Sequence, residues 1–453
     1  MAPPARSWVT RSISRRQLLS GAVAGAASLA LAGPVPLNAS RSARPSLAAD
    51  FDAGVSTAWF DLMLQLIKRT PGFSPPVASR AIGCAGLGLY EAVVPGMPGY
   101  RSLAGVLTDL PALPADGMNA AYHWPTVANS VLAAMMRSQF PTAPADLQAA
   151  ITDLEATFEG DAPLGIRTRS IDRGQSIAAA IDAWARDDGG HEGYLRNFPT
   201  SYVPPTGPGL WAPTPPDNLR ALQPFWGSNR CMALSSADQD HPGAHPDFST
   251  DDTSAFFAEA AEVFEAVEGL TAEQLEITLF WADGAGTSSP AGHSISILSQ
   301  VLASEGSSLA TAAEAYARLG IAVCDAFIAC WHVKFQYNLL RPITYIREHF
   351  DPGWGDPLPV TTPPFPEYTS GHSVQSGATT EVLTALFGSV SFTDHTHDAI
   401  GLPARSFASF DDAANEAAIS RLYGGIHYRS AIERGLEQGR GIGAKVAALP
   451  MQR

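Results

Sequence analysis

The sequence predicts a predominantly helical protein. In its N-terminal half, apolar residues recur at steps of three and four, the spacing that places them on one face of a helix. This pattern covers five segments, 55–68, 76–94, 124–138, 145–158 and 165–186. Strand-like alternation of apolar and polar residues is nearly absent, and no internal repeat is visible. The all-α class therefore rests on a periodicity found along almost the whole chain.

Residues 189–232 interrupt this pattern, because they are rich in Pro, Gly and Trp, as in the stretch from Pro204 to Trp211. A loop of this length is usually functional or a linker. A cover over a site and a plain connector both fit the composition. We therefore predict an N-terminal helical region over 50–232, which ends with this loop, and a C-terminal helical region over 233–453.

The helical pattern resumes after the loop. Helices are expected at 254–268, 271–283, 309–337, 370–387, from about 412, and at 432–447. Thr271 followed by Gln274 fits a capping box. Pro342 marks the end of the long Ala-rich helix, since Pro breaks a helical pattern. Segment 351–369 is Pro-rich and is expected to be extended.

The first 49 residues hold six Arg and no acidic residue. Arg15 and Arg16 precede a short, weakly apolar run, an order typical of a secretory signal of the twin-arginine type. We assign residues 1–49 to a signal peptide and linker and expect an exported protein, periplasmic or secreted; a basic tail is the alternative. The apolar run is too short for a membrane anchor, and no later stretch of about twenty apolar residues follows, so no membrane partner is expected.

The whole chain carries a formal net charge of −15. Beyond residue 49, 23 basic side chains face 44 acidic ones, a net charge of −21. An acidic surface argues against nucleic acid and anionic membranes as partners. It also sets apart three cations in the C-terminal third, at positions 334, 341 and 421, for which a bound anion is a physical explanation.

Three short segments hold these cations and the polar residues that accompany them. They contain Lys334, Arg341 and Pro342, then Ser370, Gly371 and His372, then Ser420, Arg421 and His427. Cations and backbone N–H groups neutralise and orient the oxygens of a tetrahedral oxyanion. One imidazole is able to bond the central atom while another moves protons.

Spacing predicts how these segments meet. Lys334 and Arg341 are seven residues apart, about two helical turns, so both are expected on one helix face. Ser370 is expected to open a helix, whose positive N-terminal end is a ready anion site, and Gly371 has no Cβ to obstruct its N–H. Gly424 and the glycine after it are expected to loosen a helix so that His427 joins the site.

The order and spacing of these segments resemble the signature shared by type 2 phosphatidic acid phosphatases, bacterial acid phosphatases and vanadium-dependent haloperoxidases. Thr369 stands where that signature has Pro, and Ala431 stands where it has an Asp thought to orient the last histidine. Trp331 and Phe365 resemble halide-side residues of vanadium chloroperoxidases. Asp283, in a Trp-Ala-Asp-Gly segment, resembles the residue that pairs with the last active-site Arg in that branch.

The resemblance implies helical bundles with one site between helices and vanadate as the cofactor. It makes His427 the vanadium ligand, His372 the residue that exchanges protons with peroxide, and Lys334 the residue that polarises the peroxide oxygen. The groups expected to hold vanadate are Lys334, Arg341, Ser370, Gly371, Arg421 and His427, with Asp283 holding Arg421. Hydrogen peroxide would oxidise halide to hypohalous acid in the catalytic region 233–453. An organic acceptor and a second copy of the chain stay open as further partners.

Two other readings use the same residues. In an exported acid phosphatase, His427 attacks phosphorus and His372 protonates the leaving alcohol; in a non-catalytic protein, the site only binds an oxyanion. With Ala431 in place of Asp, a backbone carbonyl or another carboxylate must hold the second nitrogen of His427, and Glu433 is poorly placed on helical spacing. Because a nucleophile depends more than a ligand on that carboxylate, the missing Asp favours halide chemistry.

The remaining metal-ligating residue types give weaker patterns. Two His-rich loops, one with His241 and His245 and one that runs Asp394-His395-Thr-His397-Asp398, look like metal sites. They lie in polar sequence without a supporting frame, so both loops are expected to be solvated. The four cysteines show no metal-site spacing and are interpreted as buried thiols, with a Cys84–Cys231 disulfide left open.

Overall fold

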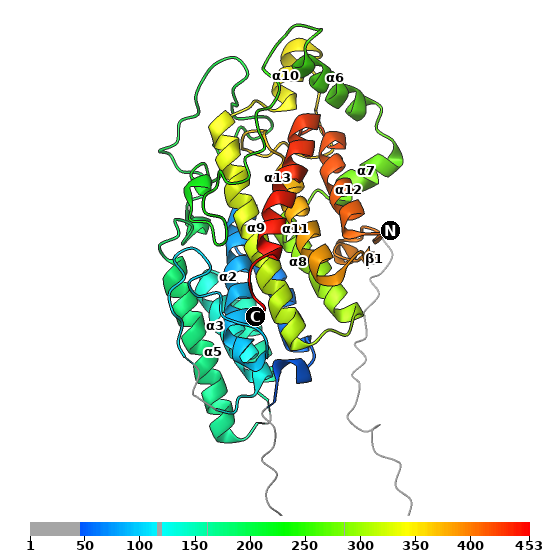
Figure 1. The fold of residues 1–453 in the computed structure, drawn as a ribbon. Helices are drawn as coiled ribbons and strands as arrows, with labels where there is room; N and C mark the ends of the chain where they lie inside the picture. The colour runs from blue at the N-terminus through cyan, green and yellow to red at the C-terminus, as the bar shows by residue number, and fades with distance from the viewer. Residues whose placement is uncertain (1–45, 116–119, 161, 285) are drawn as a thin grey trace, which may run out of the picture. The chain divides into compact units, whose positions relative to one another are not determined.

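Helices make up most of the computed structural model, which describes residues 46–115, 120–160, 162–284 and 286–453 (Figure 1). Within these ranges the single sheet is a hairpin of two short strands, β1 (Phe392–Asp394) and β2 (Arg405–Phe407). The predicted all-α class is confirmed. Arg15 and Arg16 of the expected export signal lie outside the described residues.

Five helices form the N-terminal part, each with bounds within one residue of the prediction. They are α1 (Gly54–Arg69), α2 (Pro75–Val93), α3 (Trp124–Gln139), α4 (Ala145–Thr157) and α5 (Leu164–Ala185). The agreement follows from the stripe of apolar side chains that each one buries, such as Trp59, Met63 and Leu66 on α1.

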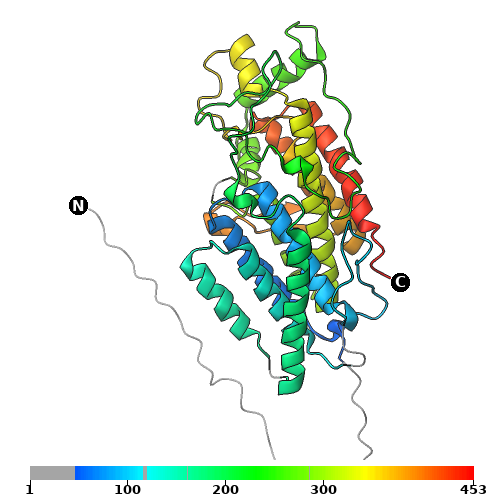
Figure 2. The same cartoon turned by 90° about the vertical axis from the view of Figure 1, so that its left-hand side faces the viewer.

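The core of the molecule is built on α9 (Leu309–Tyr337), a long Ala-rich helix with the predicted bounds. Helix α2 packs along it, and two helices from the C-terminal part of the chain, α11 (Gly371–Phe387) and α13 (Arg429–Ala447), also pack against it (Figures 1 and 2). Gly86 allows the close approach of α2, because a Cβ there would lie 2.3 Å from the carbonyl oxygen of Tyr316. Both predicted regions, 50–232 and 233–453, contribute to this core.

One helix in the described part of the chain, Pro75–Gly96, is apolar and long enough to cross a membrane, which corrects the expectation that no such stretch follows the first 49 residues. Of its most apolar window, 94% is buried inside the protein. A core helix meets the same length and composition criteria as a membrane span, and the packing of α2 against α9 accounts for its apolar character.

The C-terminal part contains two helices that periodicity did not predict, α8 and α10. Besides α9, α11 and α13, the predicted helices there are α6, α7 and α12, with bounds close to the prediction. The bounds are α6 (Ala255–Glu268), α7 (Ala272–Phe280), α8 (Ser289–Ser304), α10 (Pro342–His349) and α12 (Phe410–Tyr423). Short 3-10 helices lie at Ala48–Asp50, Val94–Gly96, Gly193–Leu195, Trp226–Ser228 and Asp398–Ile400. The predicted capping box of Thr271 and Gln274 is formed at the start of α7.

Lys334 and Arg341 do not share a helix face, contrary to the prediction. Helix α9 ends at Tyr337, and Asn338 follows in the left-handed region with a φ of 49°. Arg341 is then the N-cap of α10, whose first residue is Pro342. Pro at the first position of a helix lacks only an N–H that has no helical partner there, so Pro342 both breaks one helix and begins the next.

The Pro-rich loop over 189–232 is held by hydrogen bonds against the C-terminal end of α9 and against the segment that runs past it. The N–H of Trp211 donates to the carbonyl of Asn338 at 2.7 Å. The N–H of Leu222 donates to the carbonyl of Pro364 at 2.8 Å, and its carbonyl accepts from the indole N–H of Trp331 at 3.2 Å. The loop therefore fixes both the helix end and the segment that runs past it.

All four cysteines are buried and free, as predicted for thiols. The Cys84–Cys231 disulfide that the sequence left open is not formed.

Candidate active site

The three predicted segments converge at one end of α9, where several elements meet. Lys334 lies in the last turn of α9, Ser370 is the N-cap of α11, and Arg421 lies in the last turn of α12. His427 follows Gly425, which has a φ of +73° suited to glycine and lets the chain turn between α12 and α13. The side chains of all four site residues are almost completely buried.

The ammonium group of Lys334 is held by backbone carbonyls. Its Nζ donates to the carbonyl oxygens of Pro366 at 3.0 Å and Glu367 at 2.9 Å, and also to that of Thr369. Burial lowers the pKa of Lys334 to about 7. All three N–H groups are therefore committed to segment 366–369, and an oxyanion that binds Lys334 has to displace one of these carbonyls.

Arg341 keeps one of its donors without a hydrogen-bond partner. Its Nε donates to the carbonyl of Phe365 at 2.9 Å and its Nη1 to that of Ile426 at 2.8 Å. The same Nη1 lies 3.2 Å from Nε2 of His427. Nη2 is buried without a hydrogen-bond partner. A buried unpaired donor is costly, and an oxyanion beside His427 is the kind of group that satisfies it.

The carboxylate that holds His427 comes from Glu367, a residue that the sequence analysis did not find. Its Oε1 accepts from Nδ1 of His427 at 2.7 Å and from the N–H of Tyr428 at 2.9 Å. Of the two expected solutions, a backbone carbonyl or another carboxylate, the second is therefore correct. Ala431 contributes only its carbonyl, which accepts from the N–H of Ser370 at 3.0 Å. Glu433, correctly set aside, lies 3.9 Å from Arg429 instead.

This arrangement sets the tautomer and charge of His427. With Nδ1–H donated to Glu367, Nε2 carries the lone pair that faces Arg341. Burial lowers the pKa of His427 well below its ordinary value, and the charges of Arg341 and Lys334 act in the same direction. Burial raises the pKa of Glu367 to about 8, although the same two cations oppose the rise. His427 is thus a neutral imidazole with an oriented Nε2 that accepts from Nη1 of Arg341, so a ligand on this nitrogen has to displace that donor.

The start of α11 supplies the groups predicted from the Ser-Gly-His segment. The Ser370 hydroxyl caps the helix by accepting from the N–H of Ser373 at 3.3 Å. At Gly371, an added Cβ would meet only the ring of Trp331, at 3.7 Å, so the space beside this backbone is open. Nε2 of His372 is buried without a hydrogen-bond partner, and the side chain is 15% exposed. Burial lowers the pKa of His372 well below its ordinary value.

The predicted pairing of Asp283 with Arg421 is not formed. Arg421 donates to the Ser420 hydroxyl at 2.9 Å and to the carbonyl of Thr278 at 3.3 Å. Asp283 instead accepts from Nδ1 of His293, at 2.9 and 3.1 Å. Burial lowers the pKa of Arg421 to about 10, and the charge of Asp283 opposes this without direct contact. Asp283 is therefore used locally by histidines that the sequence analysis did not connect to it.

The two proposed halide-side residues lie together. The rings of Trp331 and Phe365 have centroids 4.9 Å apart. Nζ of Lys334 lies 5.1 Å from the Phe365 ring centroid, and the Arg341 guanidinium carbon lies 4.9 Å from it. Cations over an aromatic face are stabilised by the ring quadrupole. Nζ of Lys334 also lies 5.9 Å from the Trp331 ring centroid, so both rings lie on the side of the site that holds the cations.

Comparisons with known proteins agree with this arrangement. A family model described as the VCPO second helical-bundle domain matches residues 314–452. A vanadium chloroperoxidase of Curvularia inaequalis is 26% identical over 407 residues, which is 73% of this chain. The chain spans 65% of the length of that curated relative, slightly less than two thirds.

Solved structures extend the likeness to almost the whole fold. The crystal structure of the first bacterial vanadium-dependent iodoperoxidase is 36% identical, with a TM-score of 0.79 over 87% of this chain and 96% of that one. An apo-type bacterial vanadium-dependent chloroperoxidase is 15% identical, with a TM-score of 0.63 over 85% of this chain and 97% of that one. The second likeness shows the fold alone.

Proposed function

Because this chain belongs to the vanadium haloperoxidase superfamily, we propose that it uses hydrogen peroxide to oxidise a halide to hypohalous acid. The observation that carries the proposal is the pair formed by Nη2 of Arg341, buried without a partner, and Nε2 of His427, fixed by Glu367. Together they offer one donor for an oxyanion and one nitrogen for its central atom.

The residues present fit vanadate. His427 would bind the metal through Nε2, and the groups that would hold its oxygens are Lys334, Arg341, Ser370, the Gly371 N–H and Arg421. When bound, vanadate supplies a Lewis-acid centre that activates peroxide towards halide. The buried cations balance the negative charge of the oxyanion in a site from which water is largely excluded.

The remaining chemistry belongs to side chains at the edge of the site. His372 is neutral, and its unpaired Nε2 is available to take a proton from incoming hydrogen peroxide and to return it to a leaving oxygen. Trp331 and Phe365 form an apolar wall beside Lys334, where a weakly hydrated halide is favoured over water. An organic acceptor would receive the hypohalous acid.

Reconstitution tests this proposal. Purified protein is loaded with vanadate and supplied with hydrogen peroxide and chloride, bromide or iodide in turn, with halogenation of an organic reporter as the readout. We expect vanadate-dependent halogenation with at least one halide and none in His427→Ala. Halogenation that is independent of vanadate, or absent with all three halides, would contradict the proposal.

A second candidate, acid phosphatase activity, is favoured by one observation. The expectation that a missing Asp disfavours phosphatase chemistry loses its premise, because Glu367 supplies the carboxylate on Nδ1 of His427. A phosphatase would use Nε2 of His427 as the nucleophile, with the imidazolium of the intermediate stabilised by Glu367. Efficient hydrolysis of phosphate esters without vanadate, together with no halide oxidation in its presence, would replace the first proposal with the second.

Export is a separate proposal. It is supported by Arg15 and Arg16 before a short apolar run, and both lie outside the described residues. We propose transport of the folded chain by the twin-arginine route. Replacing both residues with Lys and fractionating the cells tests this, and undiminished export of the double variant would contradict it.

A further inference from the structure

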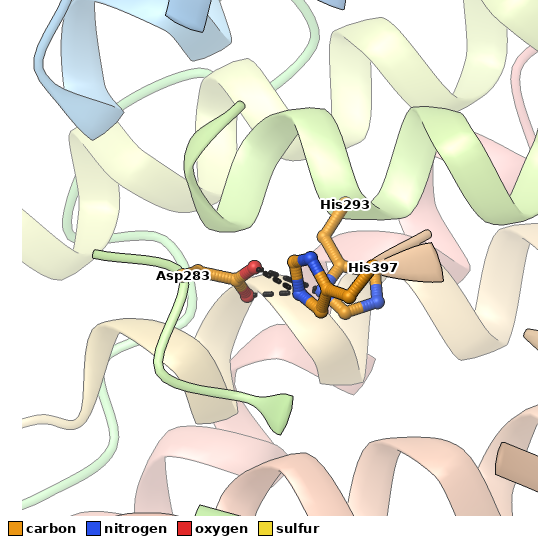
Figure 3. A group of neighbouring side chains, drawn as sticks. All are labelled: Asp283, His293 and His397. Carbon is orange, nitrogen blue, oxygen red and sulfur yellow. Dashed lines mark hydrogen bonds and ion pairs between the residues drawn. The ribbon is translucent and has the colours of Figure 1, made fainter. Parts of the chain in front are cut away.

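A second buried group of histidines and carboxylates lies next to His372 and contains Asp283, His293 and His397 (Figure 3). Asp283 follows α7, His293 is on the second turn of α8, and His397 lies in the loop after β1. Oδ2 of Asp283 is 3.7 Å from Nε2 of His372. The loop of His397 was predicted to be solvated, but His397 is 4% exposed and Asp394 fully buried.

His293 is held on both sides by carboxylates. Its Nε2 lies 2.7 Å from Oδ2 of Asp394. The other oxygen of Asp394 accepts from the N–H of Thr396 at 2.9 Å and from its hydroxyl at 2.6 Å. Asp394 is thus fixed as an acceptor, and the proton on the Nε2 side of His293 is defined by it.

Nδ1, the other ring nitrogen of His293, then needs a proton or a cation as its partner. Nδ1 of His293 lies 2.9 and 3.1 Å from the two oxygens of Asp283. If this nitrogen carried only its lone pair, it would face the carboxylate lone pairs at hydrogen-bond distance, which is repulsive. Either a proton or a metal ion must therefore lie between Nδ1 and Asp283.

His397 distinguishes these two possibilities. Its Nε2 is buried without a hydrogen-bond partner and points to the same carboxylate, 3.3 Å from Oδ1 of Asp283. With a proton between His293 and Asp283, this nitrogen has only a poorly aligned contact to a carboxylate that already accepts from His293, which is costly for a buried polar atom. One ion bonded to all three groups pairs it, and the ligand atoms lie within 4.8 Å of one another.

We propose that Asp283, His293 and His397 bind one divalent transition-metal ion of the zinc class. Two imidazoles and a carboxylate are the ligands that Zn²⁺ and its neighbours prefer, and three protein ligands leave one position open. Asp394 supplies the outer carboxylate that metal-bound histidines usually have. The two buried carboxylates, Asp283 and Asp394, also balance the charge of a divalent ion.

The ion would act on the neighbouring site through His372. A divalent cation on Asp283 removes the negative charge that faces Nε2 of His372 at 3.7 Å and replaces it with a positive one. It therefore changes the charge that faces His372, and this consequence, unlike the binding itself, rests on the proposed function.

Metal titration of the stripped full-length protein tests the binding. Zn²⁺ affinity is measured calorimetrically, and Co²⁺ is followed by its visible absorption, which is intense in a four-coordinate site. We expect one ion per chain, with affinity lowered more than about 100-fold in His397→Gln and about 10- to 100-fold in Asp394→Asn. His395→Gln is the matched control, since His395 lies on the same loop, is exposed and pairs with Asp398 at 2.9 Å. It should bind like the parent.

Several outcomes would overturn the proposal. They are no stoichiometric ion in the parent, equal losses in His395→Gln and His397→Gln, or a persistent Nδ1–H signal of His293 in nitrogen NMR of the zinc-saturated parent. If His397→Gln fails to fold, X-ray absorption of the zinc-loaded parent decides, and fewer than two imidazoles around zinc would exclude the site. His427→Ala should keep the zinc affinity while it loses halide oxidation, so the two proposals fail separately.

Discussion

His427 and His293 are both buried imidazoles held by a carboxylate, but their surroundings give them opposite charge states. His427 has one carboxylate, Glu367, and lies among Arg341, Lys334 and Arg421, which together with burial keep its pKa low. His293 lies between Asp283 and Asp394. Burial lowers the pKa of His293, but the two carboxylates outweigh this and raise it to about 10.

The difference shows that the local balance of charge decides the chemistry of a buried imidazole, because both side chains are equally inaccessible. Around His427 positive charge exceeds negative charge, which leaves a neutral ring with a lone pair and a site suited to an anion. Around His293 negative charge exceeds positive charge, which suits a proton or a metal cation. The experiments below test whether these opposite balances produce opposite effects.

The largest difference is expected in oxyanion binding. His427→Ala removes the ring nitrogen that faces Nη1 of Arg341 and should weaken vanadate binding more than about 100-fold, since outer-shell changes alone cost about 10- to 100-fold. His293→Gln, which leaves every group around His427 in place, should retain the affinity within about tenfold. Calorimetric titration with vanadate measures both. Equal affinities in the two variants would refute the assignment of His427.

The stability of the fold should depend more on the site around His293 than on the site around His427. Burial raises the pKa of Asp283, but His293, through its charge and hydrogen bonds, more than compensates, so the ionised form stabilises the fold. Asp283→Asn removes the charge from this buried pair and should lower the free energy of unfolding by about 3–5 kcal/mol.

Glu367→Gln should lower the free energy of unfolding by only about 1 kcal/mol, because burial already raises the pKa of Glu367 to about 8 and an amide oxygen still accepts from His427. Denaturant unfolding at about pH 7, where Asp283 is ionised, compares the two variants. A larger loss in Glu367→Gln than in Asp283→Asn would contradict the charge balances inferred here.

Glu367 is expected to matter more for binding than for stability. Glu367→Gln should reduce vanadate affinity about 10- to 100-fold, because the variant has a weaker acceptor for the Nδ1–H of His427. The ring of His427 is then oriented less firmly and is less basic. Glu433→Gln is the control, since Glu433 is exposed and lies beside Arg429 rather than the site. Titrations of both variants under one set of conditions provide the measurement. If Glu433→Gln shows the larger change, Glu367 is not the orienting residue.

The fold was predictable where helices bury one face. Bounds of α1 to α5 follow from the apolar stripe alone. Helix α8 was missed because most of its residues, polar and apolar, are buried, so no contrast between two faces appears in the sequence. Helix α10 was missed because Pro342 was interpreted only as the end of the preceding helix.

The site was predictable as far as its motifs are local. The spacing identified Lys334, Arg341 and His427, which converge as expected. Glu367 was not identifiable, because it is 60 residues from His427 in the chain and lies in an extended segment where no periodicity indicates its direction. His293 was missed because it lies on α8, a helix that periodicity did not predict. Asp394 was noted in a His-rich loop but interpreted as solvated, because nothing local connects it to His293, 101 residues away.

The last expected effect is a pH dependence that only the site around His427 should show near neutral pH. Burial lowers the pKa of Lys334 to about 7 and raises that of Glu367 to about 8, whereas the raised pKa of His293 keeps its charge up to about pH 10. As the pH rises above about 7, the free site loses the ammonium charge and then gains a carboxylate charge, and both changes oppose an anion. Oxyanion affinity should fall by up to about tenfold per pH unit for each coupled proton, and binding should take up protons.

Sulfate, a tetrahedral dianion that does not titrate near neutral pH, separates this effect from the ionisation of vanadate itself. Calorimetry in buffers of different ionisation enthalpy, from about pH 6 to about pH 9, measures the proton uptake directly. Lys334→Met, which keeps the buried volume but has no charge to lose, should bind more weakly than the parent at low pH and show a shallower slope. His293→Gln should keep the parent's slope, because the group that it alters does not titrate in this range. An affinity that stays constant across the range, or the same slope in Lys334→Met as in the parent, would mean that Lys334 remains charged in the free site and that its carbonyl partners outweigh its burial.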